Sequence, residues 1–189
     1  MTTTTLSQDT LRKLALMQHL GEEFFILDGI AYEGSEEEQR AIFKAFHQEN
    51  ETDKTQTFEE WCKNPLSDCI EVEEYDTDDY NNDYLVLTDS EADDKSKGYI
   101  LNSLWAFTPS FLSERTELDS EVFEAIQSNG KCEDNNDTIY NLVQKLDSIE
   151  DFVSAAISAD GRGHFMNSYD GNENEETVNG ETFYIYRIN

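Results

Sequence analysis

The sequence has little positive charge: 13 of its 189 residues are Lys or Arg, against 42 Asp and Glu. The formal net charge is −29, and the isoelectric point is near 4.1. Contacts with nucleic-acid phosphates need cations to offset the charge, so this balance excludes direct binding of DNA or RNA through the backbone. For the same reason we expect no binding to an anionic membrane surface.

Long apolar runs are also missing. No run approaches the roughly 20 residues that a membrane-spanning helix needs, and the opening MTTTTLSQDT lacks the basic and apolar regions of a secretory signal. The three cysteines, Cys62, Cys69 and Cys132, are an odd number without metal-ligand spacing, which favours a reducing compartment. We therefore expect a cytoplasmic protein with no membrane partner.

Aromatic residues, by contrast, are plentiful. High net charge with only 37% hydrophobic residues is typical of disordered chains. Such chains are poor in aromatic residues, however, and here Phe, Tyr and Trp make up 12%. The composition therefore predicts a folded protein with a carboxylate-rich surface. The length suits a single domain over residues 1–189.

The local patterns predict an α+β fold, with several helices packed on a small, mostly antiparallel sheet. Helical spacing of apolar residues begins at Leu11, and capping boxes start helices at Thr57 and Thr88. The helix that follows Thr88 is expected to run through Phe107 and to stop at Pro109.

The end of the chain has strand character. Asn179-Gly180 is the dipeptide that a type I′ turn prefers, so a C-terminal β-hairpin is expected, with residues 182–188 as its second strand. Residues 163–166 are interpreted as a further strand.

Residues 68–94 hold 12 Asp or Glu and no Lys or Arg. We interpret residues 76–83 within them as an acidic loop between two strands. Such a loop can act as a linker, which would place an internal boundary there. Alternatively, residues 70–72 and 84–87 pair as neighbouring strands of one sheet.

From Tyr84 onward the sequence contains YLVLTDSEAD, SLWAFTPSFL, VFEAIQSNGKCEDNN and ADGRGHFMNSYDGNENE, and it ends in FYIYRIN. This pattern, over about the last 100 residues, resembles a group of small acidic bacteriophage proteins. The resemblance implies a phage or prophage origin and a location in the cytoplasm of the infected host. The group carries no assigned activity, so no functional residue follows from it. By composition alone, the chain is also similar to anti-restriction and anti-CRISPR proteins that mimic nucleic acid.

The charge therefore supports the leading hypothesis: a phage-encoded inhibitor that mimics nucleic acid and binds, without turnover, the basic groove of a host nucleic-acid-binding protein. A charge of −29 equals that of about 15 base pairs, or about 50 Å of duplex. The alternative is an acidic surface that only keeps the protein in solution. The candidate partner-binding residues are Glu71, Glu73, Glu74, Asp76, Asp78, Asp79 and Asp83.

A second hypothesis is an accessory module that binds a protein or a small ligand through the motif Asp160-Gly161-Arg162-Gly163-His164. Arg162 and His164 could hold a phosphate or carboxylate, and Asp170 could orient His164. The alternative interpretation is an ordinary turn after a helix, with Arg162 paired to a nearby acid.

Enzymatic activity is not expected, because the sequence contains no recognisable catalytic set or phosphate-binding loop. No cofactor is expected either. Residues 170–181 match a calcium-binding loop at several positions, but Glu175 stands where that loop needs glycine, and Asn179-Gly180 fits a hairpin better. We therefore expect no metal site.

Overall fold

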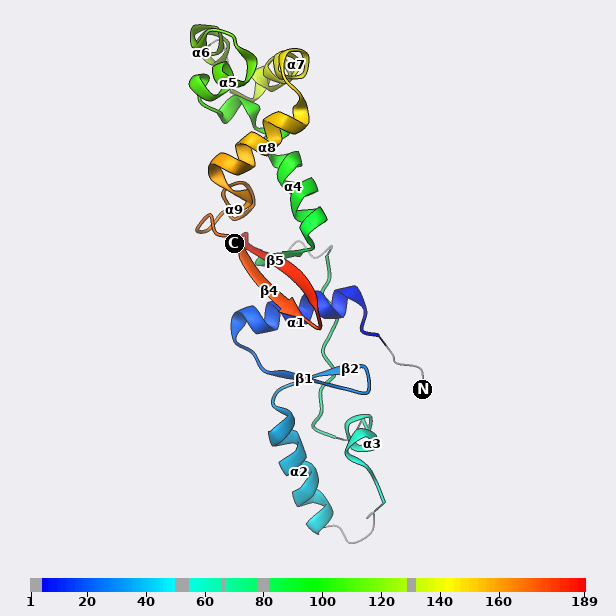
Figure 1. The fold of residues 1–189 in the computed structure, drawn as a ribbon. Coiled ribbons are helices and arrows are strands. Elements are labelled where there is room, and N and C mark those ends of the chain that lie inside the picture. Colours follow the sequence, from blue (N-terminus) through cyan, green and yellow to red (C-terminus); the bar gives the residue numbers. More distant parts are fainter. Residues whose placement is uncertain (1–4, 50–54, 66, 78–81, 129–131) are drawn as a thin grey trace. The chain divides into compact units, whose positions relative to one another are not determined.

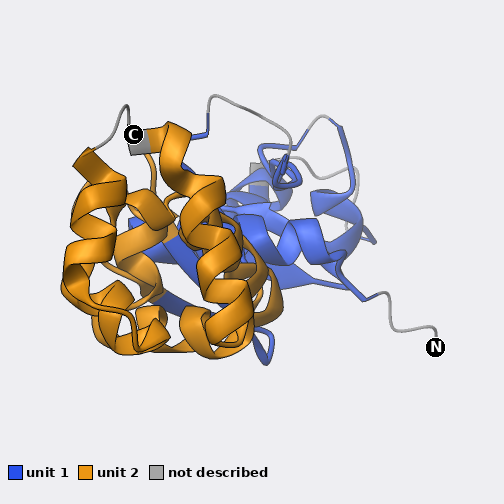
Figure 2. Ribbon diagram, turned by 90° about the horizontal axis from the view of Figure 1, so that it is seen from above, with its two compact units in different colours: residues 1–87, 175–185 blue, residues 88–174, 186–189 orange. Residues whose placement is uncertain are grey.

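The computed structural model describes residues 5–49, 55–65, 67–77, 82–128 and 132–189. The chain folds into two compact units, shown in Figure 2. Unit 1 comprises residues 1–87 and 175–185, and unit 2 comprises residues 88–174 and 186–189. The first stretch of unit 1 therefore ends just beyond the acidic loop 76–83. The predicted α+β class is confirmed, with helices, two small sheets and a C-terminal hairpin.

Unit 1 contains most of the strands (Figure 1). In chain order its elements are α1 (Gln8–Leu20), β1 (Phe24–Leu27), β2 (Ile30–Glu33), α2 (Glu36–Glu49), α3 (Phe58–Cys62) and β3 (Tyr84–Leu87), followed near the C-terminus by residues 175–178 of β4 (Asn174–Val178) and residues 181–185 of β5 (Glu181–Arg187).

Helix α1 begins where the hydroxyl of Ser7 accepts a hydrogen bond from Thr10 N at 3.0 Å, and it ends at Gly21, whose φ is 75°. These are the preferred residue types for a helix N-cap and a left-handed C-cap. Leu11 and Leu14 on its buried face belong to the same apolar core as Phe183 and Ile185 of β5. The helical spacing that begins at Leu11 therefore marks a true core face.

The two-stranded sheet β1–β2 turns at Asp28-Gly29, and residues 70–72 lie beside β2. Glu33 N donates to Ile70 O and Val72 N donates to Ala31 O, both at 2.9 Å. The predicted pairing of residues 70–72 with 84–87 is thus wrong, because 84–87 form β3 of the other sheet. A short apolar run does not specify its partner strand.

The second sheet has the strand order β3–β5–β4. Asn179 and Gly180 have φ values of 52° and 86°, so the predicted hairpin turn between β4 and β5 is confirmed. The hydroxyls of Thr177 and Thr182 lie 3.0 Å apart across this hairpin.

Unit 2 is helical and has its own apolar core. It contains α4 (Asp89–Asn102), the 3₁₀ turn η1 (Leu104–Ala106), α5 (Pro109–Thr116), α6 (Ser120–Ser128), the 3₁₀ turn η2 (Cys132–Asn135), α7 (Asn136–Leu146), α8 (Ile149–Asp160) and α9 (Arg162–Met166).

Two local predictions in unit 2 are wrong. Pro109 does not stop a long helix: α4 has already ended at Asn102, and Pro109 is the first residue of α5. Proline is favoured at that position because the first helical residue needs no N–H. Residues 163–166 form the short helix α9 rather than a strand.

Candidate functional site

Residues 71–76 of unit 1 form what we call the acidic segment. Its four carboxylate residues, Glu71, Glu73, Glu74 and Asp76, are all exposed. Between them, Val72 and Tyr75 are 5% and 7% exposed and belong to the core under α1. The two buried side chains therefore anchor the segment, and its four carboxylates point into solvent.

Hydrogen bonds hold the acidic segment along its length. Besides the bond between Val72 N and Ala31 O, Tyr75 N donates to Asp9 O at 3.2 Å, and the Tyr75 hydroxyl donates to Tyr84 O at 2.7 Å. The Glu74 carboxylate accepts from the Ser7 hydroxyl at 2.5 Å. The carboxylates are thus displayed from an ordered segment that pairs with β2 at Glu71.

Two buried tyrosines lie in or beside the acidic segment, and the pKa of each is raised. The pKa of Tyr32, which pairs with Glu71, is raised to about 12 by burial first and then by the nearby Cys62 and Glu71. Burial is also the main reason why the pKa of Tyr75 is raised.

Of the three remaining acidic candidates, the structure describes one, Asp83. Asp83 is exposed in the bend before β3, and Asn82 donates its amide to Asp76 O at 2.7 Å. Asp78 and Asp79 lie outside the described residues. Five of the seven predicted partner-binding residues are thus placed, and each is exposed.

Arg162 begins α9, and its side chain is only 11% exposed. Its Nε and Nη2 donate to the two carboxylate oxygens of Glu173 at 2.8 and 3.1 Å, and its Nη1 donates to Asp89 Oδ1 and Asp93 Oδ1 at 2.8 and 2.9 Å. Burial lowers the pKa of the guanidinium, but the hydrogen bonds with Glu173 and Asp89 outweigh it and raise that pKa. The Tyr186 hydroxyl also donates to Glu173.

These contacts make Arg162 a clamp between the start of α4 and the segment before β4. The three carboxylates surround its donors, so the arrangement fits the structural interpretation of the motif better than one in which Arg162 holds a ligand phosphate.

His164 and Asp170 lie in different settings. His164 is exposed on α9 and lines a pocket of unit 2. Asp170 closes a turn: its Oδ1 accepts from Asn172 N at 3.0 Å, a bond that lowers the pKa of its carboxyl, and its own N donates to Asn167 Oδ1 at 3.1 Å. The structure therefore does not gather Arg162, His164 and Asp170 around one point.

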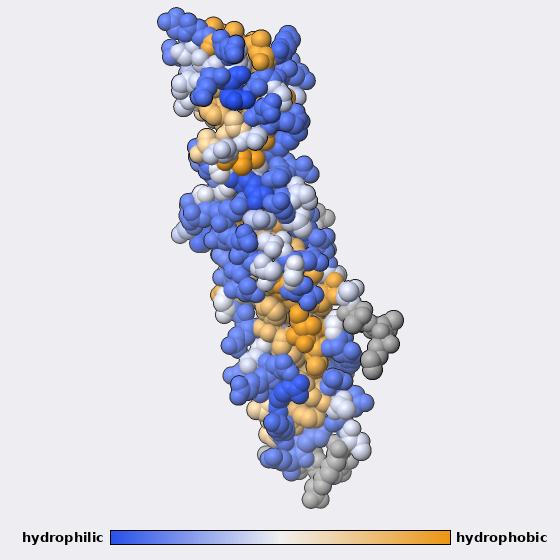
Figure 3. All heavy atoms as spheres, in the orientation of Figure 1, coloured by the Kyte–Doolittle hydropathy of each residue, from blue (hydrophilic) through white to orange (hydrophobic). Residues whose placement is uncertain are grey.

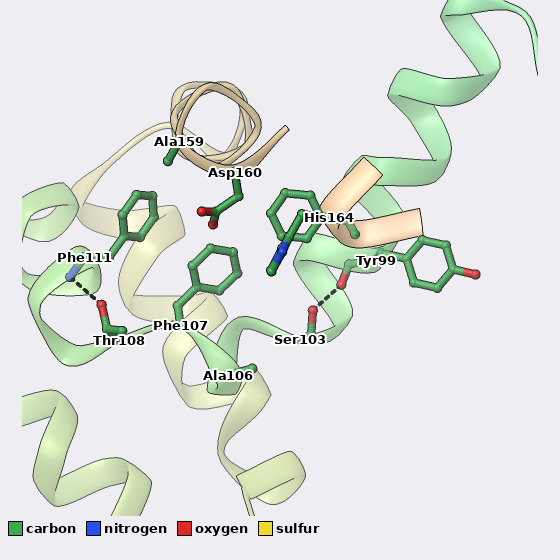
Figure 4. A pocket seen from close by; sticks show the side chains of 10 residues that line it. Tyr99, Ser103, Ala106, Phe107, Thr108, Phe111, Ala159, Asp160 and His164 are labelled. Carbon is green, nitrogen blue, oxygen red and sulfur yellow. Dashed lines mark hydrogen bonds between the residues drawn. The ribbon is translucent and has the colours of Figure 1, made fainter. Parts of the chain in front are cut away.

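The pocket that His164 lines has a volume of about 550 Å³. Asp160 also lines it, together with Phe107 and Phe111 (Figure 4). The sequence indicated the motif 160–164 but not the two phenylalanines, which are partly buried against the core of unit 2. Apolar spacing alone does not distinguish a core ring from one at the rim of a pocket.

The two described free cysteines lie close together in unit 1. Cys62 is buried at the end of α3, Cys69 is partly buried, and their Sγ atoms are 3.0 Å apart. No sequence pattern predicts that these two residues meet. Burial, followed by the contact with Cys69, raises the pKa of the Cys62 thiol to about 12.

This raised pKa leads to a prediction about thiol reactivity. At pH 7.5 Cys62 is expected to react with iodoacetamide at least tenfold more slowly than a solvent-exposed cysteine, because the thiolate is the reactive form. The rate should rise as the pH is raised toward 10. Mass spectrometry of the modified peptide, with unfolded protein as the control, measures both. Equal rates in folded and unfolded protein would contradict the prediction.

Comparisons with protein-family models, curated proteins and solved structures give no match for this chain. Among the described residues, no helix has both the length and the apolar character to cross a membrane. In the same part of the chain, no three His, Cys, Asp or Glu side chains are grouped to hold a metal ion.

Proposed function

We propose that this chain is a phage-encoded inhibitor that binds the basic groove of a host nucleic-acid-binding protein, stoichiometrically and as an acidic mimic of nucleic acid. The observation that carries the proposal is the acidic segment, in which four of six consecutive residues present exposed carboxylates. Its partner would be a DNA- or RNA-binding defence or processing protein.

The charge density of the acidic segment supports this proposal. An extended chain rises by about 3.3 Å per residue, so four charges in six residues correspond to about one charge per 5 Å. One strand of duplex DNA carries one phosphate per roughly 3.4 Å of helix axis. The two densities are similar enough for several basic side chains of a groove to find carboxylates in place of phosphates.

The surroundings of the acidic segment add to the negative field. Unit 1 carries 24 Asp or Glu and 6 Lys or Arg, and no Lys or Arg lies between residues 68 and 94. On the face drawn in Figure 3, hydrophilic side chains cover much of the surface, although apolar residues gather near β1 and β2. A field of one sign accelerates association with an oppositely charged groove.

The ordered backbone of the acidic segment matters for affinity. Binding does not have to order the segment first, because Val72 and Tyr75 are already buried. A preorganised charged surface loses less conformational entropy on association than a disordered acidic tail does.

The direct test uses the immobilised protein as bait for the fraction of a bacterial lysate that binds duplex DNA. A protein that is retained at low salt, released by rising salt and displaced by a duplex of about 15 base pairs supports the proposal. If the captured proteins stay bound at high salt, or if the duplex does not displace them, charge mimicry is not the mechanism.

A matched pair of variants locates the binding surface. In the first, Glu71, Glu73 and Glu74 become Gln and Asp76 becomes Asn. In the second, four exposed acids of unit 2 become Gln: Glu114, Glu121, Glu124 and Glu133. The two variants have the same net charge, so they differ only in where the charge is removed.

Affinity for the captured protein should fall about tenfold or more in the first variant, since each exposed ion pair contributes up to about 1 kcal/mol. The loss of affinity should come mainly from slower association, and it should be smaller at high salt. The second variant should bind nearly as the unmodified protein does. Equal losses in both variants would show that only net charge matters.

A further inference from the structure

Unit 2 contains an open pocket of about 550 Å³, within the range of roughly 300–1,000 Å³ that is usual for small-molecule sites. Its walls come from the end of α4, from η1 and the start of α5, and from α8 and α9. The lining residues are Tyr99, Ser103, Ala106, Phe107, Thr108, Phe111, Ala159, Asp160, His164 and Phe165.

We propose that this pocket binds a small organic cation: an amine carried on an aromatic or similarly flat apolar body. The pocket belongs to unit 2 and the acidic segment to unit 1, so this site does not depend on the proposed inhibitor function.

Aromatic rings form the apolar wall of the pocket. The rings of Phe107 and Phe111 are stacked with their centroids 5.3 Å apart, and Phe107 and Phe165 are stacked at 6.2 Å. Ring faces of this kind stabilise a flat apolar group by contact and attract a cation through their quadrupoles.

One carboxylate supplies the charge. Asp160 is the last residue of α8, and Figure 4 shows its carboxylate directed into the space that the rings of Phe107 and Phe111 and the imidazole of His164 border. A ligand ammonium beside Asp160 would therefore meet a carboxylate on one side and ring faces on the others.

The other polar groups that line the pocket are largely engaged with the backbone. The Ser103 hydroxyl donates to Tyr99 O at 2.5 Å, and the Thr108 hydroxyl oxygen accepts from Phe111 N at 3.3 Å (Figure 4). Asp160 and His164 are then the side chains best placed to determine which ligand charge the pocket prefers.

The charge balance selects a cation over an anion. The ten lining residues include one carboxylate and no Lys or Arg, and unit 2 as a whole carries 18 Asp or Glu and 7 Lys or Arg. A nucleotide phosphate or a fatty-acid carboxylate would enter this field without a counter-charge, which is unfavourable.

Three probes of similar size test the proposal: phenethylamine, 2-phenylethanol and 3-phenylpropionate. They share a phenyl ring on a short chain and differ in charge. Each is titrated into the full-length protein at about 150 mM salt, where the Debye length is about 8 Å and the distant charges are screened. Chemical shifts of backbone amides and of the His164 ring report both affinity and location.

The amine should shift the His164 ring and bind about fivefold more tightly than the alcohol, which corresponds to the upper range of an exposed ion pair or cation–π contact. The carboxylate should not bind at the pocket. Equal affinities for all three probes, shifts that map outside the pocket, or no binding by any probe would each overturn the proposal.

Variants distinguish the effect of the Asp160 carboxylate from that of the overall negative charge of unit 2. Asp160→Asn should reduce the affinity for the amine to that for the alcohol, whereas Glu124→Gln, which removes an exposed acid of α6, should leave it unchanged. Phe111→Leu keeps apolar volume but removes a ring face, and it should weaken both probes. If Asp160→Asn binds the amine like the unmodified protein, Asp160 is not the anionic partner and the proposal fails.

Discussion

Replacing Gly163 with alanine is expected to destabilise unit 2 more than any conservative surface change. Gly163 is buried in α9, and a Cβ there would lie 2.6 Å from Asn172 C and 2.8 Å from Glu173 N, and would also clash with Gly171 O. All three atoms belong to the backbone, so the clash cannot be relieved by rotating a side chain. Overpacking of this kind costs about 3 kcal/mol, at the upper end of its usual range.

This loss of stability is expected because α9 packs closely against the segment that precedes β4. Asn167 joins the two through its own N, which donates to Gly163 O, and its amide, which donates to Asn172 O, both at 2.8 Å. Moving the segment away to admit a Cβ would disturb these bonds and the contact of Glu173 with Arg162. Thermal unfolding of unit 2 should shift down by about 12 °C or more.

Gly98→Ala is the matched control. Gly98 lies inside α4 and is exposed, and a Cβ built there meets nothing within 4 Å. Alanine should stabilise this helix by about 0.5–1 kcal/mol, because glycine is the poorer helix former. Hydrogen exchange at the amides of α4 and α9 measures both variants. Equal protection in the two alanine variants would show that the close approach at Gly163 is not maintained in solution.

The local features of the fold could be predicted from the sequence because neighbouring residues cause them. The capping box at Thr57 forms as expected, with Thr57 N donating to Glu60 Oε2 at 2.9 Å and Glu60 N donating to the Thr57 hydroxyl at 3.2 Å. The turn at Asn179-Gly180 needs two residues that tolerate positive φ, and these two do.

The contacts that organise the candidate sites join residues far apart in the chain. Arg162 meets Asp89, which is 73 positions away, and in a chain with 42 acids no spacing rule identifies that partner. Charge composition indicated correctly that Arg162 would find a carboxylate, but not that it would find three. Likewise, nothing in the separation of Cys62 and Cys69 implies that their sulfurs approach to 3.0 Å.

Removing Arg162 is the second change with a large expected effect. In Arg162→Met, the carboxylates of Asp89, Asp93 and Glu173 keep their places but lose the cation between them. Breaking a buried ion pair costs about 3–5 kcal/mol. Here the side chains of Asp89 and Asp93 are 71% and 63% exposed, so water screens part of the repulsion. A loss of about 2 kcal/mol in the free energy of unfolding of unit 2 is therefore expected.

A conservative variant identifies the cause of that loss. Arg162→Lys should lose less than Arg162→Met, because lysine keeps the charge but cannot form the two-pronged contact with Glu173.

Lys97→Met is the control for a cation on the surface of the same unit. Lys97 pairs with Glu150 at 2.9 Å, but the two side chains are 40% and 74% exposed, so no measurable loss is expected. Denaturant unfolding followed by circular dichroism at neutral pH compares the variants. If Arg162→Met is as stable as Lys97→Met at neutral pH, the clamp contributes little to folding, and Arg162 would then have to be reconsidered as a residue that binds an acidic ligand.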